Sequence, residues 1–534
     1  MANEPTQGKI QGRWSRLHSQ RYAHLNRARR CSALTLPHLL PEESADFNTA
    51  LPTPYQGLGA RAVNHLASKL WMALLPPNSP FFRLSLAPSV EEEIQEVTNG
   101  EALKSDIQNS LAAIERRAVN EVDTKGLRSP AFKAIRHLVT TGNCLVYMPP
   151  TPDENAHQWH TETSGLKVFR LDQFVVSRDP VGNLLELVIK EPVAIGALPE
   201  DIRNKVEGEG QGKGSNPEKL VDLYTQVYLE DGEYHVRQEV GGEEIDTSYG
   251  TYKPEELPWL ALRWSVDDDY GRGLVEEYLG DFESLESLSQ AIVEGSLAAA
   301  KVVFLVNPNG VTRERNLANA RNCDFKPGLA DDVSVLQMDK YHDFRVAAEE
   351  KKEIEQRLSY AFLLHSAVQR NAERVTAEEV RFMAEELEDA LGGVYSILAQ
   401  EFQLPLVRLI MARLQENGDI PNLPKEALNP VITTGLEALG RNHQQAKLRT
   451  FISEITQVMG PEAVSTYINA EEYIKRSGTN YGIDTEGLIR TNQEVQQMQQ
   501  QQQLMAAAQE SAPGVAQEMT KGAMQNGSKQ QQGE

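Results

Sequence analysis

The chain has 534 residues, with 53 Lys and Arg against 76 Asp and Glu, which gives a formal net charge of −23. Hydrophobic residues make up 40 % of it and charged residues 24 %, a balance that excludes wholesale disorder and a small disulfide scaffold. The negative charge excludes a general polyanion binder, because an acidic surface repels DNA at long range and leaves only local or weak nucleic-acid contacts.

A basic segment comes first in the chain. Six arginines lie between residues 13 and 30, with aromatic and aliphatic side chains interleaved, and this pattern predicts an amphipathic helix with a charged face. Two interpretations of that face stay open: it is solvated, or it contacts an acidic partner or nucleic acid. The candidate contact residues are Arg13, Arg16, Arg27 and Arg30.

Helices and then strands follow this segment. Apolar spacing, proline and glycine predict helices over residues 57–75, 101–123 and 130–141. A period of two predicts strands over residues 167–176, 184–195, 220–229, 234–240 and 260–266. Asp231-Gly232 predicts a hairpin, because glycine tolerates positive φ. The glycine-rich segment 208–214 indicates a mobile loop, and its alternative, a phosphate cradle, lacks a following Gly-Lys-Ser/Thr.

Two helices that flank a β-like insert form the centre of the chain. The first helix is predicted over 273–300 and the second over 349–365, with apolar residues on one face and acids on the other. The insert contains strand patterns at 302–306, 333–338 and 344–347. The acids on the two helices include Glu283, Glu286, Glu294 and Glu353, and the insert carries Arg313, Arg315, Arg321 and Lys326.

The last third begins with a capped helix and ends in low complexity. Thr376 and Glu379 form a capping box, and Gly392-Gly393 and Pro405 predict bends in the helix that follows. A further helical segment is predicted over 426–473. From about residue 491 glutamine dominates, so this tail is predicted to be disordered.

Catalytic and metal-binding motifs are scarce. The three cysteines have no Cys-x-x-Cys spacing, and no phosphate loop, His-Glu-x-x-His or Gly-x-Ser-x-Gly is present, so we expect no enzyme, no metal and no cofactor. Asp267-Asp268-Asp269 is a possible Mg²⁺ or Ca²⁺ cluster, or a polar turn that caps the next helix. The first thirty residues lack a signal-peptide core, and no apolar run reaches about 20 residues, which predicts a soluble protein made in a cytoplasm.

Seven strings of the sequence resemble one known family, the head-to-tail connector or portal proteins of short-tailed podoviruses of the Autographiviridae type. The similarity extends from about residue 8 to residue 490. The strings are GARAVNHLASKL at 59–70, YGRG at 270–273 with EEYLGD at 276–281, SAVQR at 366–370 running into ERVTAEE at 373–379, LEDALGGVYSIL at 387–398, and TGLEALG at 434–440.

The resemblance implies an α+β, mainly helical, portal-type fold that assembles as a cyclic, usually dodecameric ring around a central channel. The family layout divides this chain into N-terminal helices with a mixed β wing (1–272), a stem helix (273–300), a clip insert (301–348), a second stem helix (349–365), a tunnel loop (366–376), a long bent wing helix (377–425), a crown (426–490) and the Gln-rich tail (491–534).

The resemblance also implies a function and partners. The ring occupies one capsid vertex of the virion, and double-stranded DNA is packaged and later ejected through it without sequence-specific contacts. The missing phosphate loop fits this role, since the terminase large subunit would supply the ATPase motor. Further implied partners are the major capsid protein, a scaffolding protein, a tail adaptor and internal core proteins, with no membrane, and synthesis takes place in the host cytoplasm.

Site residues follow from the same layout. Ring symmetry would repeat each channel-facing side chain, so acidic stem faces would repel phosphates and a few basic residues would hold DNA weakly. The tunnel-loop candidates are Gln369, Arg370, Glu373 and Arg374, although Arg374 would alternatively pair with Glu378. The basic residues of the insert would dock acidic surfaces of terminase or tail adaptor, or form a plain solvated patch.

Two other functional classes stay open. A metal-dependent nuclease or hydrolase could be built on scattered acids such as Asp267 and Asp269. A helical scaffolding or internal virion protein that forms no ring is the other class, and the β-like insert argues against it because a simple helical scaffold has no need for one.

Overall fold

A computed structural model describes a large part of the chain, in two compact units. The described residues are 10–43, 45, 48–76, 81–85, 100–149, 165–198, 200, 202–203, 218–266, 268–299, 303–336, 341–364, 385–391, 393–420, 431–434, 451–458, 460 and 473. One unit contains residues 1–101 and 113–439, and the other contains 102–112 and 440–534. The glycine-rich segment, the capping box, the predicted tunnel loop, most of the predicted crown and the Gln-rich tail lie outside the described residues.

An antiparallel six-stranded sheet is the largest β element of the first unit. Its strand order is β4-β5-β6-β7-β8, and β9 also pairs with β7. The predicted hairpin at Asp231-Gly232 is confirmed, since these residues have φ values of 49° and 86° between β6 and β7. The strands are β4 (Phe174–Arg178), β5 (Leu184–Ala194), β6 (Leu220–Glu230), β7 (Glu233–Val240), β8 (Glu243–Glu244) and β9 (Gly250–Tyr252).

A smaller sheet, of order β10-β2-β3, shares a core with the large one. Its strands are β2 (Asn143–Tyr147), β3 (Lys167–Phe169) and β10 (Trp259–Arg263). The Trp259 ring stacks on Tyr147, with centroids 4.7 Å apart. The predicted single strand over 167–176 is therefore wrong: a 3-10 turn at Leu171–Gln173 divides it into β3 and β4, which belong to different sheets.

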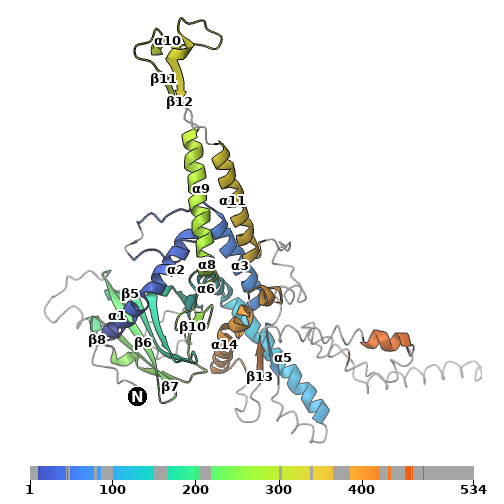
Figure 1. Cartoon of the computed structure of the whole chain (residues 1–534). Helices are drawn as coiled ribbons and strands as arrows, with labels where there is room; N and C mark the ends of the chain where they lie inside the picture. The colour runs from blue at the N-terminus through green and yellow to red at the C-terminus, as the bar shows by residue number, and fades with distance from the viewer. Residues whose placement is uncertain are drawn as a thin grey trace, which may run out of the picture. The chain divides into compact units, whose positions relative to one another are not determined.

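Helices pack against both sheets (Figure 1). The predicted basic helix is two helices, because Arg21 lies in a turn between α1 (Ile10–Gln20) and α2 (Tyr22–Leu34). Trp14 and Leu17 of α1 pack on Val188 of the large sheet. The next helices match their predicted spans closely, and they are α3 (Leu58–Leu74), α5 (Gly100–Thr124) and α6 (Arg128–Thr141).

Two long helices lie side by side in the first unit, and a hairpin connects their ends in the sequence (Figure 1). After the short α8 (Leu274–Glu277) comes α9 (Leu279–Ala299), which packs against α11 (Tyr341–Ala361). We call α9 and α11 the helix pair. Phe362 lies edge-on to Phe282, and Arg357 binds Asp281 at 2.9 Å. The chain between α9 and α11 contains β11 (Val303–Val306), α10 (Glu314–Ala318) and β12 (Val333–Leu336). We call these elements and their loops, residues 303–336, the hairpin unit.

The start of α11 corrects one prediction. Residues 344–347 are helical and not a strand, and the second helix begins at Tyr341 instead of 349. A short apolar run fits either period, and contact with α9 decides between them. Phe344 lies against Gly295, where an added Cβ would lie 2.3 Å from the ring.

The predicted long helix after residue 377 is interrupted at Gly393, as predicted, whereas at Pro405 the chain stays helical. Gly393 adopts φ 92° immediately before α13 (Val394–Leu398), and Pro405 lies in the first turn of α14 (Leu404–Glu416). Between these helices, Ala399–Gln403 forms a π-helix. A pairing that no local pattern predicted joins β1 (Phe82–Ser85) to β13 (Val431–Thr434).

The remaining elements are short. The described part of the second unit is helical over 451–458 and over the stretch of α5 that it contains. No described helix is long and apolar enough to cross a bilayer. Further 3-10 turns are Ile195–Ala197, Asp246–Ser248 and Ala330–Asp332.

Candidate functional site

The segment that leads into the first long helix, residues 268–273, is held rigidly, and we call it the base segment. The Asn143 side chain makes two hydrogen bonds to the Gly271 backbone: it donates to the carbonyl at 2.7 Å and accepts from the N–H at 2.8 Å. Gly142 ends α6 with φ 74°, and an added Cβ there would lie 2.4 Å from the Gly273 nitrogen. Only glycine fits this approach of two backbones.

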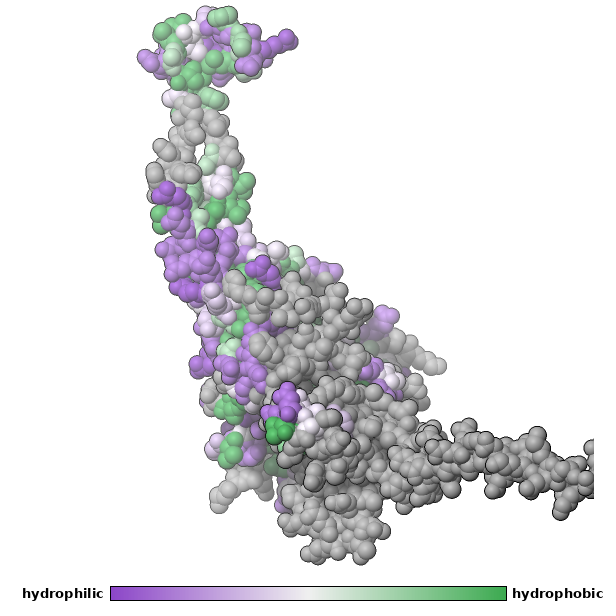
Figure 2. All heavy atoms as spheres, turned by 90° about the vertical axis from the view of Figure 1, so that its right-hand side faces the viewer, coloured by the Kyte–Doolittle hydropathy of each residue, from purple (hydrophilic) through white to green (hydrophobic). Residues whose placement is uncertain are grey.

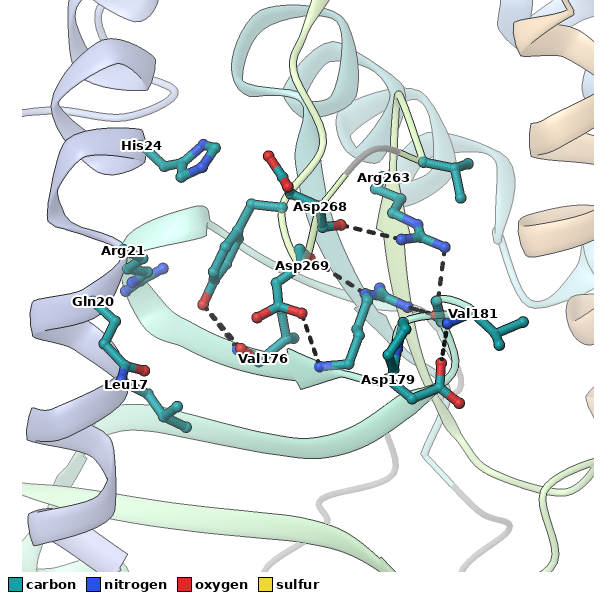
Figure 3. Close-up of a pocket in the computed structure, with 15 residues that line it drawn as sticks. Leu17, Gln20, Arg21, His24, Val176, Asp179, Val181, Arg263, Asp268 and Asp269 are labelled. Atoms are coloured by element: carbon teal, nitrogen blue, oxygen red, sulfur yellow. Dashed lines mark hydrogen bonds between the residues drawn. The ribbon is translucent and has the colours of Figure 1, made fainter.

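Two further contacts fix the base segment to the large sheet (Figure 3). The Asp269 carboxylate accepts from the Arg178 backbone N–H at 3.0 Å. The Val176 N–H donates to the Tyr270 hydroxyl oxygen at 2.9 Å. The base segment is therefore held by the Asn143 side chain of β2, by backbone N–H groups of β4 and by the close backbone approach of Gly142 at the end of α6.

A cavity of about 480 Å³ lies between α1, the base segment and the loop after β4 (Figure 3). Arg21 is buried in its wall, 5.6 Å from the Trp14 ring centroid and 6.0 Å from that of Tyr270. Its guanidinium donates to the carbonyls of Leu171 and Asp172. Burial lowers the pKa of Arg21. The pattern of six arginines in the sequence did not predict that Arg21 is buried.

Three of the four predicted basic contacts bind acids of the same chain. Arg13 binds Glu186, with Nε 2.8 Å from Oε2. Arg27 binds Glu276 at 2.8 Å, and Arg30 binds Glu283. A solvated face describes only Arg16, which is exposed. The structure thus brings the predicted basic segment against the predicted acidic helix face.

The four predicted acids have different surroundings. Glu286 accepts from the backbone N–H groups of Tyr55 at 2.8 Å and Gln56 at 3.2 Å, so it anchors the chain that precedes α3. Glu294 is exposed but accepts from the Gln290 side chain at 2.9 Å and from the Tyr55 hydroxyl at 3.4 Å, and Glu353 is exposed. Together with the pairing of Glu283, these contacts give three of the four predicted acids intramolecular partners, and a channel-lining role stays a prediction.

The surface of the hairpin unit mixes hydrophilic and hydrophobic residues (Figure 2). Its four cations are balanced by four acids, Glu314, Asp324, Asp331 and Asp332. Arg313, Arg315 and Arg321 are exposed, and Lys326 lies 3.5 Å from Asp324. Large apolar side chains are exposed between them, namely Phe304, Val311, Leu317, Phe325 and Leu329. Such a surface is typical of a protein-binding site.

Asp332 organises the hairpin unit from inside. Its carboxylate accepts from the Thr312 N–H at 3.0 Å, and the Thr312 hydroxyl in turn bonds Leu329. Hydrogen bonding from the Thr312 backbone lowers the pKa of Asp332. An added Cβ at Gly310 would lie 2.3 Å from this carboxylate, so the turn closes tightly on it.

Two of the three predicted aspartates make hydrogen bonds within the chain. The Asp269 carboxylate accepts a hydrogen bond from the Arg178 backbone N–H, and the Asp268 backbone carbonyl accepts one from the Arg263 side chain. Asp267 lies outside the described residues. Among the residues that the structure describes, no three His, Cys, Asp or Glu side chains are grouped so that they could hold a metal. Gln369, Arg370, Glu373 and Arg374 lie outside the described residues.

Comparison with known proteins gives one consistent answer. Residues 7–489 match the family model described as bacteriophage head to tail connecting protein. The portal protein of Escherichia phage T7 is 41 % identical over 95 % of this chain and 92 % of its own length. That of Enterobacteria phage T3 is 42 % identical over 90 % of this chain and 88 % of its own length. The structural alignment with a chain from the virion of a native gene transfer agent particle covers 80 % of this chain and 90 % of that chain. Its TM-score of 0.33, at 14 % identity, supports no conclusion.

Proposed function

The chain belongs to the family of bacteriophage head-to-tail connecting, or portal, proteins, and from that premise we propose that it assembles into a ring at one vertex of a capsid. Double-stranded DNA would pass through the ring during packaging and ejection. The observation that carries the proposal is the identity of 41 % over 95 % of the chain with a portal protein of nearly the same extent.

The described structure supports a division of labour within each subunit. The helix pair would be the stem, the hairpin unit the clip, and the sheets with α1, α2 and α14 the wing. The mixed apolar and charged surface of the hairpin unit suits a clip that binds protein partners in succession, first terminase and then a tail adaptor, because neither charge sign dominates it. The predicted tunnel loop, 366–376, would follow the second stem helix.

The DNA contacts would be weak by design. A net charge of −23 on each subunit repels phosphates overall, so a duplex would touch only local basic groups repeated around the ring. Arg370 and Arg374 are our candidates for those groups. The capsid protein, a scaffolding protein and internal core proteins would contact other faces of the ring.

Electron microscopy of the purified full-length chain, together with its solution mass, tests the proposal. Rings with a central hole and a mass near twelve times 59.5 kDa, about 714 kDa, are expected for the usual dodecameric state. A monomer that stays monomeric at high concentration and with added scaffolding protein would contradict the ring. A divalent-dependent nuclease activity that Asp267→Ala removes would favour the alternative instead.

A further inference from the structure

Arg263, the last residue of β10, contacts three segments that are far apart in the sequence. Its Nε lies 3.3 Å from Glu401 Oε1 in the π-helix. Its Nη1 donates to the carbonyl of Asp268 at 3.2 Å, and Nη2 to that of Gly182 at 3.4 Å. The side chain is only 5 % exposed. One buried guanidinium therefore joins the π-helix, the base segment and the loop after β4.

The surroundings are shaped to this side chain. Gly182 has φ 101°, and an added Cβ there would lie 2.5 Å from Arg263 Nη2. An added Cβ at Gly271, in the base segment, would lie 2.9 Å from Arg263 Cβ. Both neighbours thus need glycine, since any larger side chain would displace the guanidinium or the backbone.

The π-helix is fixed on its other side as well. Gln403 is fully buried and donates its side-chain amide to the Leu74 carbonyl, and the Tyr395 hydroxyl donates to Ala73 at 3.3 Å. Ahead of this anchored stretch, Gly393 breaks the helix. π-helical turns are rare and are frequently found at functional sites.

We infer that Arg263 is a positioning residue that couples the π-helix to the base segment, so that a displacement of one is transmitted to the other. Its fork of donors reaches both segments at once, which a lysine with a single ammonium group cannot reproduce. Because the Arg263 side chain is buried, loss of the charge on the partly exposed Glu401 leaves the guanidinium without this counter-ion and weakens its hold on Asp268.

The value of such coupling rests on the proposed function, whereas the coupling itself does not. The π-helix belongs to the long bent helix that follows the proposed tunnel loop, and the base segment begins the first stem helix. Arg263 would then carry a displacement from the channel side of the wing to the stem.

Hydrogen exchange on the full-length chain, read by mass spectrometry, tests the inference. We expect Glu401→Gln to speed exchange of peptides covering 268–273 by about tenfold or more, although the substitution lies in the π-helix. Arg263→Lys should speed hydrogen exchange both in 268–273 and in 399–403, because lysine keeps the positive charge but lacks the several N–H donors of the guanidinium.

A matched control is present in the same unit. Lys69 binds Glu386 at 3.2 Å with side-chain exposures of 5 % and 28 %, against 5 % and 27 % for Arg263 and Glu401. This pair joins α3 to the helical turn before Gly393 and does not touch the base segment. Glu386→Gln should therefore change exchange locally and leave 268–273 unchanged.

Three results would overturn the inference. In the first, Glu401→Gln changes hydrogen exchange only in residues 399–403. In the second, Glu386→Gln speeds hydrogen exchange of the base segment as strongly as Glu401→Gln does. In the third, protection falls uniformly in both Glu401→Gln and Arg263→Lys, which would make the pair a general stabilising contact. Ring formation is read separately by microscopy, so a chain that shows the coupling but forms no ring would contradict the proposed function alone.

Discussion

Asn143 is the residue on which the base segment depends most directly. Its side chain is buried, and both of its polar atoms are used by the Gly271 backbone. Asparagine is the small residue that offers a donor and an acceptor in one plane, so it can pair with a peptide group as another peptide would.

Asn143→Ala should lower the free energy of unfolding by about 2 to 4 kcal/mol, because two buried backbone groups lose their partners. Urea unfolding of the wild type and the variant measures this. Asn183→Ala is the matched control, since the Asn183 side chain bonds only Asp179 in an exposed turn, and its effect should stay within about 0.5 kcal/mol. An equal effect of the two substitutions would contradict the role of Asn143.

Asp332 makes the hairpin unit sensitive to acid. Its folded pKa lies below its ordinary value of 3.8, so its contribution to stability is complete above that value and is lost as the pH falls through the folded pKa. We expect exchange of 303–336, corrected for its intrinsic pH dependence, to rise only below about pH 4.

Asp332→Asn should open the hairpin unit already at neutral pH and flatten this acid dependence. The neighbouring exposed Asp331→Asn is the control and should leave the profile as in the wild type. A profile in Asp332→Asn that matches the wild type would show that another group titrates.

At the scale of elements, the N-terminal helices bind the helix pair through complementary charge. Arg27 and Glu276 have side-chain exposures of 34 % and 13 %, so their attraction is only partly screened. Glu286 adds backbone hydrogen bonds from the chain before α3. These contacts attach α2 and the following loop to α8 and α9.

Reversing one charge should weaken this attachment, and reversing both should restore it. Arg27→Glu is expected to cost about 1 kcal/mol of unfolding free energy, and Arg27→Glu with Glu276→Arg should recover most of it. Thermal unfolding of the two single variants and the double variant measures the cycle. Arg16→Glu, at an exposed position, is the control, and a double variant no better than its singles would rule out direct pairing.

At the scale of the whole molecule, weak DNA contact by a strongly acidic ring is the central expectation. Arg370→Ala should leave ring assembly intact and reduce the retention of packaged DNA at low salt. The difference from the wild type should shrink at higher salt, because salt screens the phosphate contacts that the variant lacks. DNA release from assembled particles measures this. If the substitution abolished assembly in the absence of DNA, Arg370 would be structural and the tunnel-loop assignment wrong.

Helices and turns whose sequence patterns are local could be predicted from the sequence alone. Helix spans such as 57–75, the Asp231-Gly232 hairpin and the interruption at Gly393 follow from backbone preferences of one or a few residues and their neighbours along the chain. Family membership was also available, because long strings such as that at 59–70 carry more information than any single motif.

Only the tertiary structure decided which partner each charged or apolar residue takes. The basic segment is divided at Arg21, which is buried and lies 6.0 Å from the ring centroid of Tyr270, a residue far away in the sequence. Residues 344–347 are helical, and Phe344 in this stretch packs against Gly295 of α9. Arg263 pairs with Glu401, which lies 138 residues later in the sequence. A pattern of charges or of short apolar runs is compatible with several partners, and the partner is chosen only when distant segments pack together.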